Sequence, residues 1–166
     1  MVSRNKLKLG GRHSLQIAVT LARRARRAGK RVVTTNGCFD ILHVGHIRNL
    51  TFARSLGDIL LVGINSDASV RSSKGAGRPI VPARERCELL SALRAVDCVF
   101  VFSDVTPRAW LAKIRPDVHV KGADRKLHTG KALESDVVEK YGGRVVFFNH
   151  TGHSTTRLLK RARGAT

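Results

Sequence analysis

The first 39 residues contain no aspartate or glutamate, and the first acidic side chain is Asp40. Acidic residues are scarce throughout, with 12 against 31 lysines and arginines, for a formal net charge of +19. Ten basic residues lie within 1–31 and four within 157–163, which leaves 17 basic and 12 acidic residues between these ends. The excess charge therefore belongs mainly to the ends of the chain, and we expect its field to attract polyanions such as ATP.

The basic ends leave two interpretations open. A cluster of four arginines, Arg23, Arg24, Arg26 and Arg27, suits nucleic-acid binding. A run of charge is more often the solvated face of a helix, however. We therefore do not expect nucleic acid as the main partner.

Other absences narrow the class of protein. No run approaches the roughly 20 apolar residues that a membrane helix needs. The segment Met1–Gly11 lacks the apolar stretch of a secretion signal, so we expect a cytoplasmic protein with no membrane partner. Three cysteines, Cys38, Cys87 and Cys98, have no zinc-site spacing and are expected to be reduced thiols, the last two in the core.

Short β-branched runs alternate with helical stretches along the chain. The expected strands are 31–35, 58–64, 97–102, 117–120 and 144–148. Helices are expected from Ser14 to Ala28, from Val44 to Leu56, from Pro82, from Thr106 as cap to Ile114, after residue 130 to Tyr141, and from Ser154. Ser66–Val70 is expected to form a short turn or helix, Ser72–Ile80 a flexible loop, and 122–130 a further loop.

This alternation predicts an α/β protein: one Rossmann-like domain with a five-stranded parallel sheet and helices on both faces. We expect the domain to span 14–160, between a basic N-terminal arm of residues 1–13 and a basic tail of residues 161–166. Such sheets bind ligands at the carboxyl ends of their strands, beside the topological switch point. The loops after the strands are therefore the places to look for a site.

The loop after the first expected strand is the most informative. It reads Thr-Asn-Gly-Cys-Phe-Asp-Ile-Leu-His-Val-Gly-His over Thr35–His46. His43 and His46 lie three apart at a helix start, on one face of its first turn. The free N–H groups there favour phosphate. A metal site is the alternative, but no third ligand is nearby and no carboxylate follows in zinc-protease spacing.

Other residues of this loop are expected to shape it. Gly37 and Gly45 carry no side chain, so a base or a phosphate can approach the backbone closely. Phe39 is expected to pack, and Asp40 to hydrogen-bond locally and fix the loop.

The Thr35–His46 string is similar to the HxGH signature of the nucleotidyltransferase (cytidylyltransferase-like) superfamily. It resembles most closely the adenylyltransferases that make ADP-heptose from D-glycero-β-D-manno-heptose 1-phosphate. The resemblance covers roughly 14–160, and the glycerol-phosphate cytidylyltransferases share its first and last motifs. Further matching segments are Gly63–Arg71, Gly77–Ile80, Glu85–Leu90, Val120–Gly122 and Ser154–Thr156.

The resemblance implies that His43 and His46 contact the triphosphate and stabilise charge as the α-phosphorus is attacked. It also implies that Lys74 reaches the phosphates, with a solvated loop lysine as the alternative. Arg86 is expected on phosphate too, and a surface ion pair with Glu85 or Glu88 is its alternative.

The remaining motifs are expected to bind the nucleotide. After the fourth strand the family tends to read VKGGD. This chain has Lys121, Gly122 and Asp124 at the matching positions, but Ala123 replaces the second glycine. Ser154, Thr155 and Thr156 open the last helix as a second phosphate cradle, or Ser154 is an ordinary cap. The expected nucleotide-binding residues are Asn36, Gly37, Cys38, Phe39, Asp40, Gly45, Lys121, Gly122, Asp124, Ser154, Thr155 and Thr156.

We therefore expect an adenylyltransferase that transfers AMP from ATP to a heptose 1-phosphate and releases pyrophosphate. Mg²⁺ is expected to arrive with ATP, because no dedicated metal cage is visible in the sequence. Relatives with this signature are often dimers, so a homodimer is possible. The alternatives are a cytidylyltransferase or a flavin adenylyltransferase of the same superfamily, and a nucleic-acid-binding protein on this scaffold.

Overall fold

The computed structural model describes residues 14–123, 130–149, 155–162 and 164. Its centre is one parallel sheet of five strands in the order β3-β2-β1-β4-β5. The strands are β1 (Val32–Gly37), β2 (Ile59–Asn65), β3 (Cys98–Phe102), β4 (Val118–Gly122) and β5 (Arg144–Phe148). The expected Rossmann-like α/β fold is confirmed, and β1 and β4 each extend two residues further than expected, because Asn36, Gly37, Lys121 and Gly122 continue their ladders.

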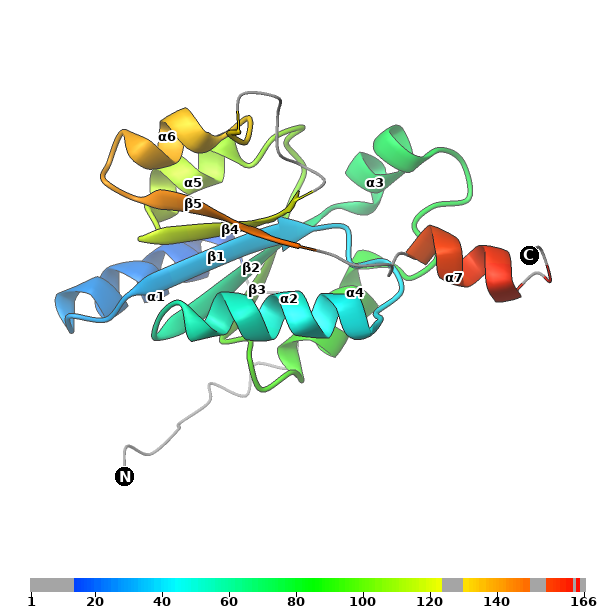
Figure 1. The fold of residues 1–166 in the computed structure, drawn as a ribbon, viewed down its shortest axis with the longest axis horizontal. Helices are drawn as coiled ribbons and strands as arrows, with labels where there is room; N and C mark the ends of the chain where they lie inside the picture. Colours follow the sequence, from blue (N-terminus) through cyan, green and yellow to red (C-terminus); the bar gives the residue numbers. More distant parts are fainter. Residues whose placement is uncertain (1–13, 124–129, 150–154, 163, 165–166) are drawn as a thin grey trace.

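Helices cover both faces of this sheet (Figure 1). They are α1 (Leu15–Arg27), α2 (Val44–Ser55), α3 (Asp67–Lys74), α4 (Ala83–Ser91), α5 (Arg108–Ile114), α6 (Ser135–Glu139) and α7 (Thr155–Ala162). One core cluster joins α1, α5 and α6 to the sheet, and a second joins α2 and α4 to it. Of the helices in the described ranges, none combines the length and the apolarity needed to cross a bilayer.

Apolar side chains alternate between the two cores along the strands. In β2, Leu61 belongs to the cluster beneath α1 and α5, whereas its neighbours Leu60 and Val62 belong to the cluster beneath α2 and α4. Cys87 and Cys98 are buried core residues, as expected. Burial, with a smaller contribution from nearby Asp97, raises the pKa of Cys98 to about 12, so this thiol stays protonated and unreactive.

Three aspartates bind the strands together at the amino end of the sheet. Asp58, Asp97 and Asp117 each precede a strand. The carboxylate of Asp58 accepts a hydrogen bond from the backbone N–H of Arg31, at 2.7 Å. Asp97 accepts one from the N–H of Leu60, at 2.8 Å, and Asp117 accepts one from the N–H of Val32, at 2.7 Å. These hydrogen bonds join neighbouring strands at the amino end of the sheet, and the cleft described below lies at the carboxyl end.

Several helix boundaries differ from the sequence expectation. The cap of α5 is Pro107, not Thr106. The helix expected up to Tyr141 is reduced to α6, because the turn before it is held by a hydrogen bond from the Ala132 N–H to the Ser135 hydroxyl, at 2.9 Å. The segment expected to be a flexible loop from Ser72 begins inside α3, whose cap is Ser66. Ser14 caps α1 as expected.

The topology fixes where a ligand can bind. The chain passes from β1 outward to β2 and β3, then returns across the sheet to β4 and β5 on the other side of β1. The switch point therefore lies between β1 and β4. The connections that follow these two strands run in opposite directions and leave a crevice beyond the carboxyl ends of the strands. Open α/β sheets bind their ligands in this crevice.

Candidate active site

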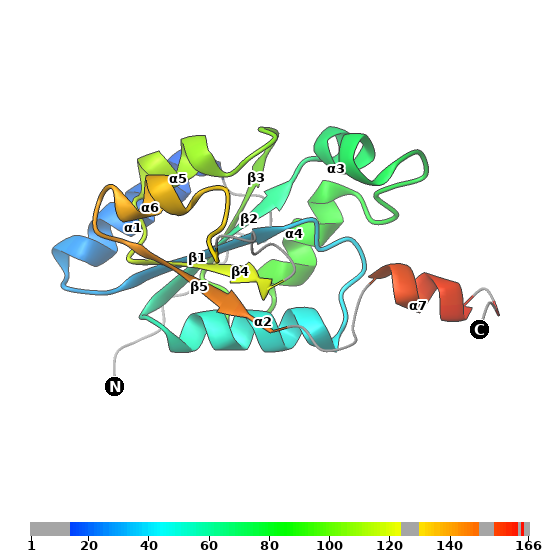
Figure 2. The ribbon, with the colours of Figure 1, turned by 45° about the horizontal axis from the view of Figure 1, so that its top comes forward.

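A cleft of about 960 Å³ lies at the switch point. Its walls come from segments far apart in the sequence: the end of β1 and the loop after it, the start of α2, α3, the segment after β3, the end of β4, and the starts of α6 and α7. Figure 2 shows α3 and α7 beyond the carboxyl ends of the strands, which is where this cleft opens. The loops singled out in the sequence are therefore brought together in one place.

The two histidines form a stacked pair at the start of α2. Their ring centroids are 3.8 Å apart and the rings are inclined by 18°. His43 is the N-cap residue, and its carbonyl oxygen accepts the N–H of His46 at 2.9 Å. Both residues line the cleft, as expected, whereas Gly45 is buried within the first turn of α2. The stack presents two imidazoles side by side to a ligand.

Phe39 packs against this pair through His46. Its side chain is buried, as expected, and its ring centroid lies 5.1 Å from that of His46. Phe39 has a positive φ of 47°, a conformation that costs a non-glycine residue about 1 kcal/mol. A Cβ on Gly37 would come within 3.2 Å of the Phe39 ring, so the glycine leaves room for this ring as well as lining the cleft.

Asp40 fixes the loop through a distant segment, not through local hydrogen bonds. One carboxylate oxygen accepts the backbone N–H groups of Ile80 and Val81, at 2.8 and 2.9 Å. The other lies 2.8 Å from Nε of Arg78 in an ion pair. The segment before α4, expected to be flexible, is thus tied to the histidine loop at its far end.

Arg86 is a fully buried arginine behind the cleft. Its guanidinium donates to the carbonyl oxygen of Cys38 at 2.5 Å, to that of Val81 at 2.9 Å, and to the carboxylate of Asp67 at 2.6 Å. It does not appear among the residues that line the cleft. The alternative of a surface ion pair with neighbouring glutamates is wrong, because the guanidinium is buried and joins three segments of the chain.

The start of α7 lies beside the histidine loop at the cleft. Thr155 and Thr156 both line it, and the Thr155 hydroxyl donates to the carbonyl oxygen of Ile41 at 3.3 Å. Ser154 lies outside the described residues. Two helix beginnings, one with imidazoles and one with hydroxyls, therefore meet at one cavity, as the sequence predicts.

The wall formed by α3 is polar. Lys74 is exposed in the last turn of this helix and lines the cleft together with the hydroxyls of Ser69, Ser72 and Ser73. A hydrogen bond from the side-chain amide of Asn65 to the Ser69 hydroxyl, at 3.1 Å, joins this wall to the end of β2. The exposed position of Lys74 allows it to reach a ligand, and its contact with phosphate stays a prediction.

The end of β4 contributes a lysine that is already paired. Lys121 and Gly122 line the cleft, and Asp124 lies outside the described residues. The Lys121 ammonium lies 2.7 Å from a carboxylate oxygen of Glu134 and donates to the side-chain oxygen of Asn36 at 3.1 Å. The same carboxylate oxygen lies 3.4 Å from Nε2 of His119.

Burial and charge set the ionisation of this group. Burial lowers the pKa of His119, and the charge of Lys121 lowers it further, against the opposing effect of Glu134, so the imidazole is neutral. Burial also disfavours the charged form of Glu134, but His119 and Lys121 outweigh it and lower the pKa of this carboxyl to about 2. The carboxylate is therefore ionised at neutral pH.

Sequence reasoning missed several residues of this region. Glu134 and Asn49 line the cleft, His119 contacts Glu134, and Asp67 pairs with Arg86 behind the cleft. A polar residue inside an otherwise apolar strand, as His119 is in β4, was the available signal. Nothing in the local sequence marks Glu134, because its partner is 13 positions away on another element.

The described residues do not contain a group of three or more histidine, cysteine, aspartate or glutamate side chains that could hold a metal ion. The two carboxylates of the cleft, Asp40 and Glu134, are already paired with Arg78 and Lys121.

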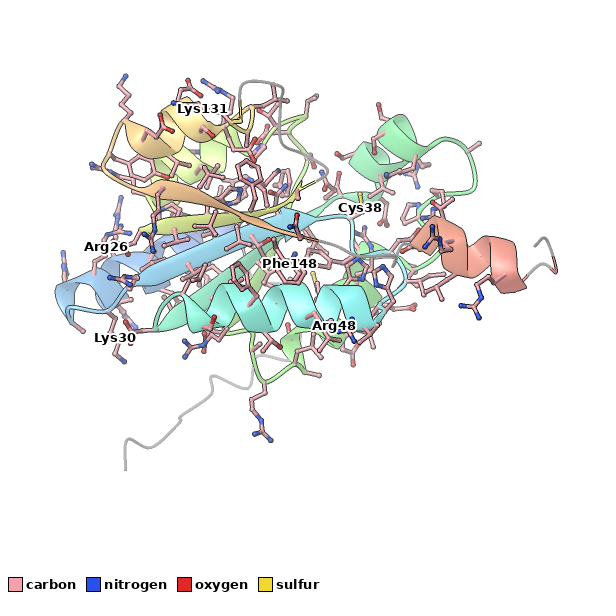
Figure 3. The ribbon with its side chains drawn as sticks, viewed as in Figure 1. Arg26, Lys30, Cys38, Arg48, Lys131 and Phe148 are labelled. Carbon is pink, nitrogen blue, oxygen red and sulfur yellow. The ribbon has the colours of Figure 1, made fainter. Side chains whose placement is uncertain are left out.

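The arginine cluster of the sequence lies away from the cleft. Figure 3 shows Arg26 and Lys30 toward one end of the molecule, well away from Cys38. Arg26 donates to the carbonyl oxygens of Ile114 and Arg115, at 2.8 and 2.9 Å, so it joins α1 to the end of α5. At least one of the four arginines therefore has a structural role.

An α/β sheet with a cleft at its switch point is typical of nucleotide-binding proteins. The sequence model of the cytidylyltransferase-like family matches residues 34–160, which includes the histidine loop and the start of α7. The chain therefore belongs to the cytidylyltransferase-like family.

Individual relatives agree with this assignment. The chain is 49% identical to the bifunctional protein HldE of Syntrophotalea carbinolica over 82% of its own length and 28% of that protein. It is 44% identical to the bifunctional protein HldE of Geotalea uraniireducens over 90% of its own length and 30% of that protein. The chain thus spans less than a third of the length of these relatives.

A solved structure shares the fold as well as part of the sequence. The lipopolysaccharide core biosynthesis protein of Thermoplasma volcanium superposes with a TM-score of 0.62 at 28% identity, over 76% of this chain and 100% of that chain.

Replacement of Arg86 by lysine should destabilise the fold. The lysine keeps the charge but cannot hold Cys38, Val81 and Asp67 at once, so we expect unfolding free energy to fall by about 2–4 kcal/mol. Urea denaturation measures this loss. Arg84→Lys, at an exposed position of the same helix, is the matched control, and equal stabilities of the two variants would contradict the role given to Arg86.

The pair of His119 and Glu134 should make stability fall in acid. The pKa of His119 is lower in the folded chain than in the unfolded chain, where it has its ordinary value of 6.5. Below pH 6.5 the unfolded state therefore binds a proton on this imidazole that the folded state does not bind. The contribution of Glu134 is present above 4.5 and is lost as pH falls toward 2. Both effects reduce stability as pH falls.

Urea denaturation at a series of pH values tests this dependence. Between about pH 7 and pH 5 the wild type should lose up to about 1.4 kcal/mol per pH unit from His119 alone. His119→Gln removes that titration, so its stability should change less over the same interval. A variant with the same slope as the wild type would show that His119 does not titrate differently in the two states.

Proposed function

We propose that the protein is a sugar-phosphate adenylyltransferase, which transfers AMP from ATP to a heptose 1-phosphate and releases pyrophosphate. The stacked histidines at the start of α2 and the threonines at the start of α7, which line one cleft, carry this proposal. The resemblance of the Thr35–His46 string to heptose 1-phosphate adenylyltransferases supports the choice of substrates, as does the identity of 44–49% to proteins named HldE.

The reaction needs positioning and positive charge more than it needs a protein nucleophile. An oxygen of the sugar phosphate attacks the α-phosphorus of ATP, and the bond from that phosphorus to the bridging oxygen of the leaving pyrophosphate breaks. Negative charge grows on the oxygens around the α-phosphorus and on the leaving group. Donors held in place before the reaction lower the barrier, because they need not reorganise as this charge develops.

The cleft supplies donors of this kind from separate elements. His43 and His46 offer imidazole N–H groups at the start of α2, and Thr155 and Thr156 offer hydroxyls at the start of α7. Lys74 adds an exposed ammonium on the α3 wall. A triphosphate bound in the cleft would contact donors from three separate elements.

We expect the nucleotide to bind as its magnesium complex. Phosphate oxygens and water are sufficient ligands for Mg²⁺, which neutralises charge on the triphosphate. The protein residues then bind and orient the complex. Because ATP and sugar phosphates are cytoplasmic metabolites, we place the activity in the cytoplasm, and the possible homodimer stays a prediction.

A pyrophosphate-release assay with ATP, CTP, GTP and UTP, each with a panel of sugar phosphates and with glycerol 3-phosphate and a flavin, tests the proposal. Release from ATP with a heptose 1-phosphate is expected. Preference for CTP with glycerol 3-phosphate, or for ATP with a flavin, would favour the related transferases instead. Salt-dependent DNA binding without pyrophosphate release would favour a nucleic-acid-binding protein.

His46→Ala should reduce kcat by about 10²–10³-fold, because it removes a donor to charge that develops in the transition state. Thr51→Ala, at an exposed position of the same helix outside the cleft, is the control and should keep wild-type turnover. Steady-state pyrophosphate release measures both variants. A His46→Ala enzyme of normal kcat would rule out the role assigned to this imidazole.

Lys74→Ala should mainly raise KM for ATP, by about 3–10-fold, since an exposed ammonium contributes modestly to phosphate binding. Arg71 lies one turn earlier in α3, is exposed, and does not line the cleft, so Arg71→Ala is a matched loss of charge on the same helix. Initial-rate kinetics at varied ATP compare the two. Equal effects would mean that Lys74 acts only through the general field of the protein.

A further inference from the structure

A chain of polar contacts runs from the interior of the sheet to the floor of the cleft. Thr34 of β1 lies opposite His119 of β4, and the Thr34 hydroxyl lies 2.8 Å from Nδ1 of that imidazole. Nε2 of His119 lies 3.4 Å from Glu134, which lies 2.7 Å from the Lys121 ammonium. Asn36 is the other acceptor of this ammonium, at 3.1 Å.

The chemistry of the partners assigns the protons along this chain. A neutral imidazole donates from one nitrogen and accepts at the other. Because the Glu134 carboxylate can only accept, Nε2 carries the proton that faces it, and Nδ1 accepts the Thr34 hydroxyl proton. The network therefore consists of a neutral histidine, one carboxylate and one ammonium, with no net charge.

The burial of the members is graded toward the cleft. Thr34 and the His119 side chain are fully buried, the Glu134 side chain is 3% exposed, and the Lys121 side chain is 11% exposed. Glu134 and Lys121 are also the members that line the cleft with Asn36. The Lys121 ammonium has three N–H donors, which are enough to contact Glu134, Asn36 and one ligand atom at the same time.

The side chain of Glu134 is not used by its own helix. Glu134 is the N-cap residue of α6, yet its side chain makes no capping hydrogen bond. Its backbone carbonyl accepts the N–H of Val138, at 3.2 Å, in the first hydrogen bond of the helix. The carboxylate contacts His119 and Lys121 instead. These contacts matter because an unpaired buried carboxylate would destabilise the fold.

We propose that Glu134, oriented by His119 and Thr34, is a positioning residue that holds the Lys121 ammonium at the floor of the cleft, where Lys121 contacts a phosphate oxygen of a substrate. The inference rests on the proposed function, and it adds which buried residues prepare that contact. A flexible lysine would lose side-chain freedom when it bound a phosphate. Lys121 has lost that freedom already, because two acceptors hold its ammonium before a substrate arrives.

The shared chemistry is a phosphate, which either substrate can supply. Calorimetric binding of α,β-methylene-ATP with Mg²⁺, and separately of a heptose 1-phosphate, distinguishes the two sources. Glu134→Gln should raise the Kd of one of these ligands by about tenfold, because the neutral amide no longer holds the ammonium. Glu139→Gln, which removes an exposed ion pair with Lys131 from the same helix, is the matched control and should leave both Kd values unchanged.

A double-mutant cycle separates positioning from a general structural role. If Glu134 acts through Lys121, Glu134→Gln should change the Kd by less than about twofold when Lys121 is already methionine. A structural role would give the same loss in both backgrounds. That additive result, or wild-type affinity of Glu134→Gln for both ligands, would overturn the proposal.

A second variant decides the question if Lys121→Met does not fold. Thr34→Val keeps both charged residues and removes only the hydroxyl that orients His119. It should weaken binding of the same ligand by a smaller factor, about threefold, and unchanged affinity would count against the network. A wild type that binds nucleotide but releases no pyrophosphate would contradict the proposed reaction and leave the positioning role of Glu134 standing.

Discussion

The histidine loop depends on one buried guanidinium, that of Arg86. Three acceptors from separate segments converge on it: the carbonyl of Cys38 inside the loop, the carbonyl of Val81 before α4, and the carboxylate of Asp67 at the start of α3. Asp40 ties the loop to the same segment from the other side. The stacked imidazoles can therefore hold a fixed position, although the loop that carries them has a positive φ at Phe39.

The fold was predictable because each element carries its own signal. The continuous apolar run of β2 predicted a strand buried on both faces, and Ser14 and Gly29 marked the ends of α1. The helix before β5 was overestimated, because a local hydrogen bond from the Ala132 N–H to the Ser135 hydroxyl makes a turn where a helix was expected. Hydrophobic periodicity does not include such contacts between a side chain and the backbone.

The site was predictable only where its residues follow one another in the sequence. His43 and His46 share a helical turn, so their stacking follows from their spacing. Arg86 was expected at the phosphates and instead lies fully buried behind the loop, because its acceptors come from segments that meet only after folding. Glu134 gave no signal, since a single glutamate before a short helix is an ordinary surface residue until β4 places Lys121 beside it.

The position of α7 has a consequence for how the cleft is completed. This helix extends away from the layered body, and the hydrogen bond from Thr155 to Ile41 joins its first turn to the histidine loop (Figures 1 and 2). A phosphate held between the histidines and the threonines would bridge these two parts of the chain. The ligand would then contribute to holding α7 against the rest of the domain. Ligand binding at the cleft and docking of α7 would therefore be thermodynamically linked.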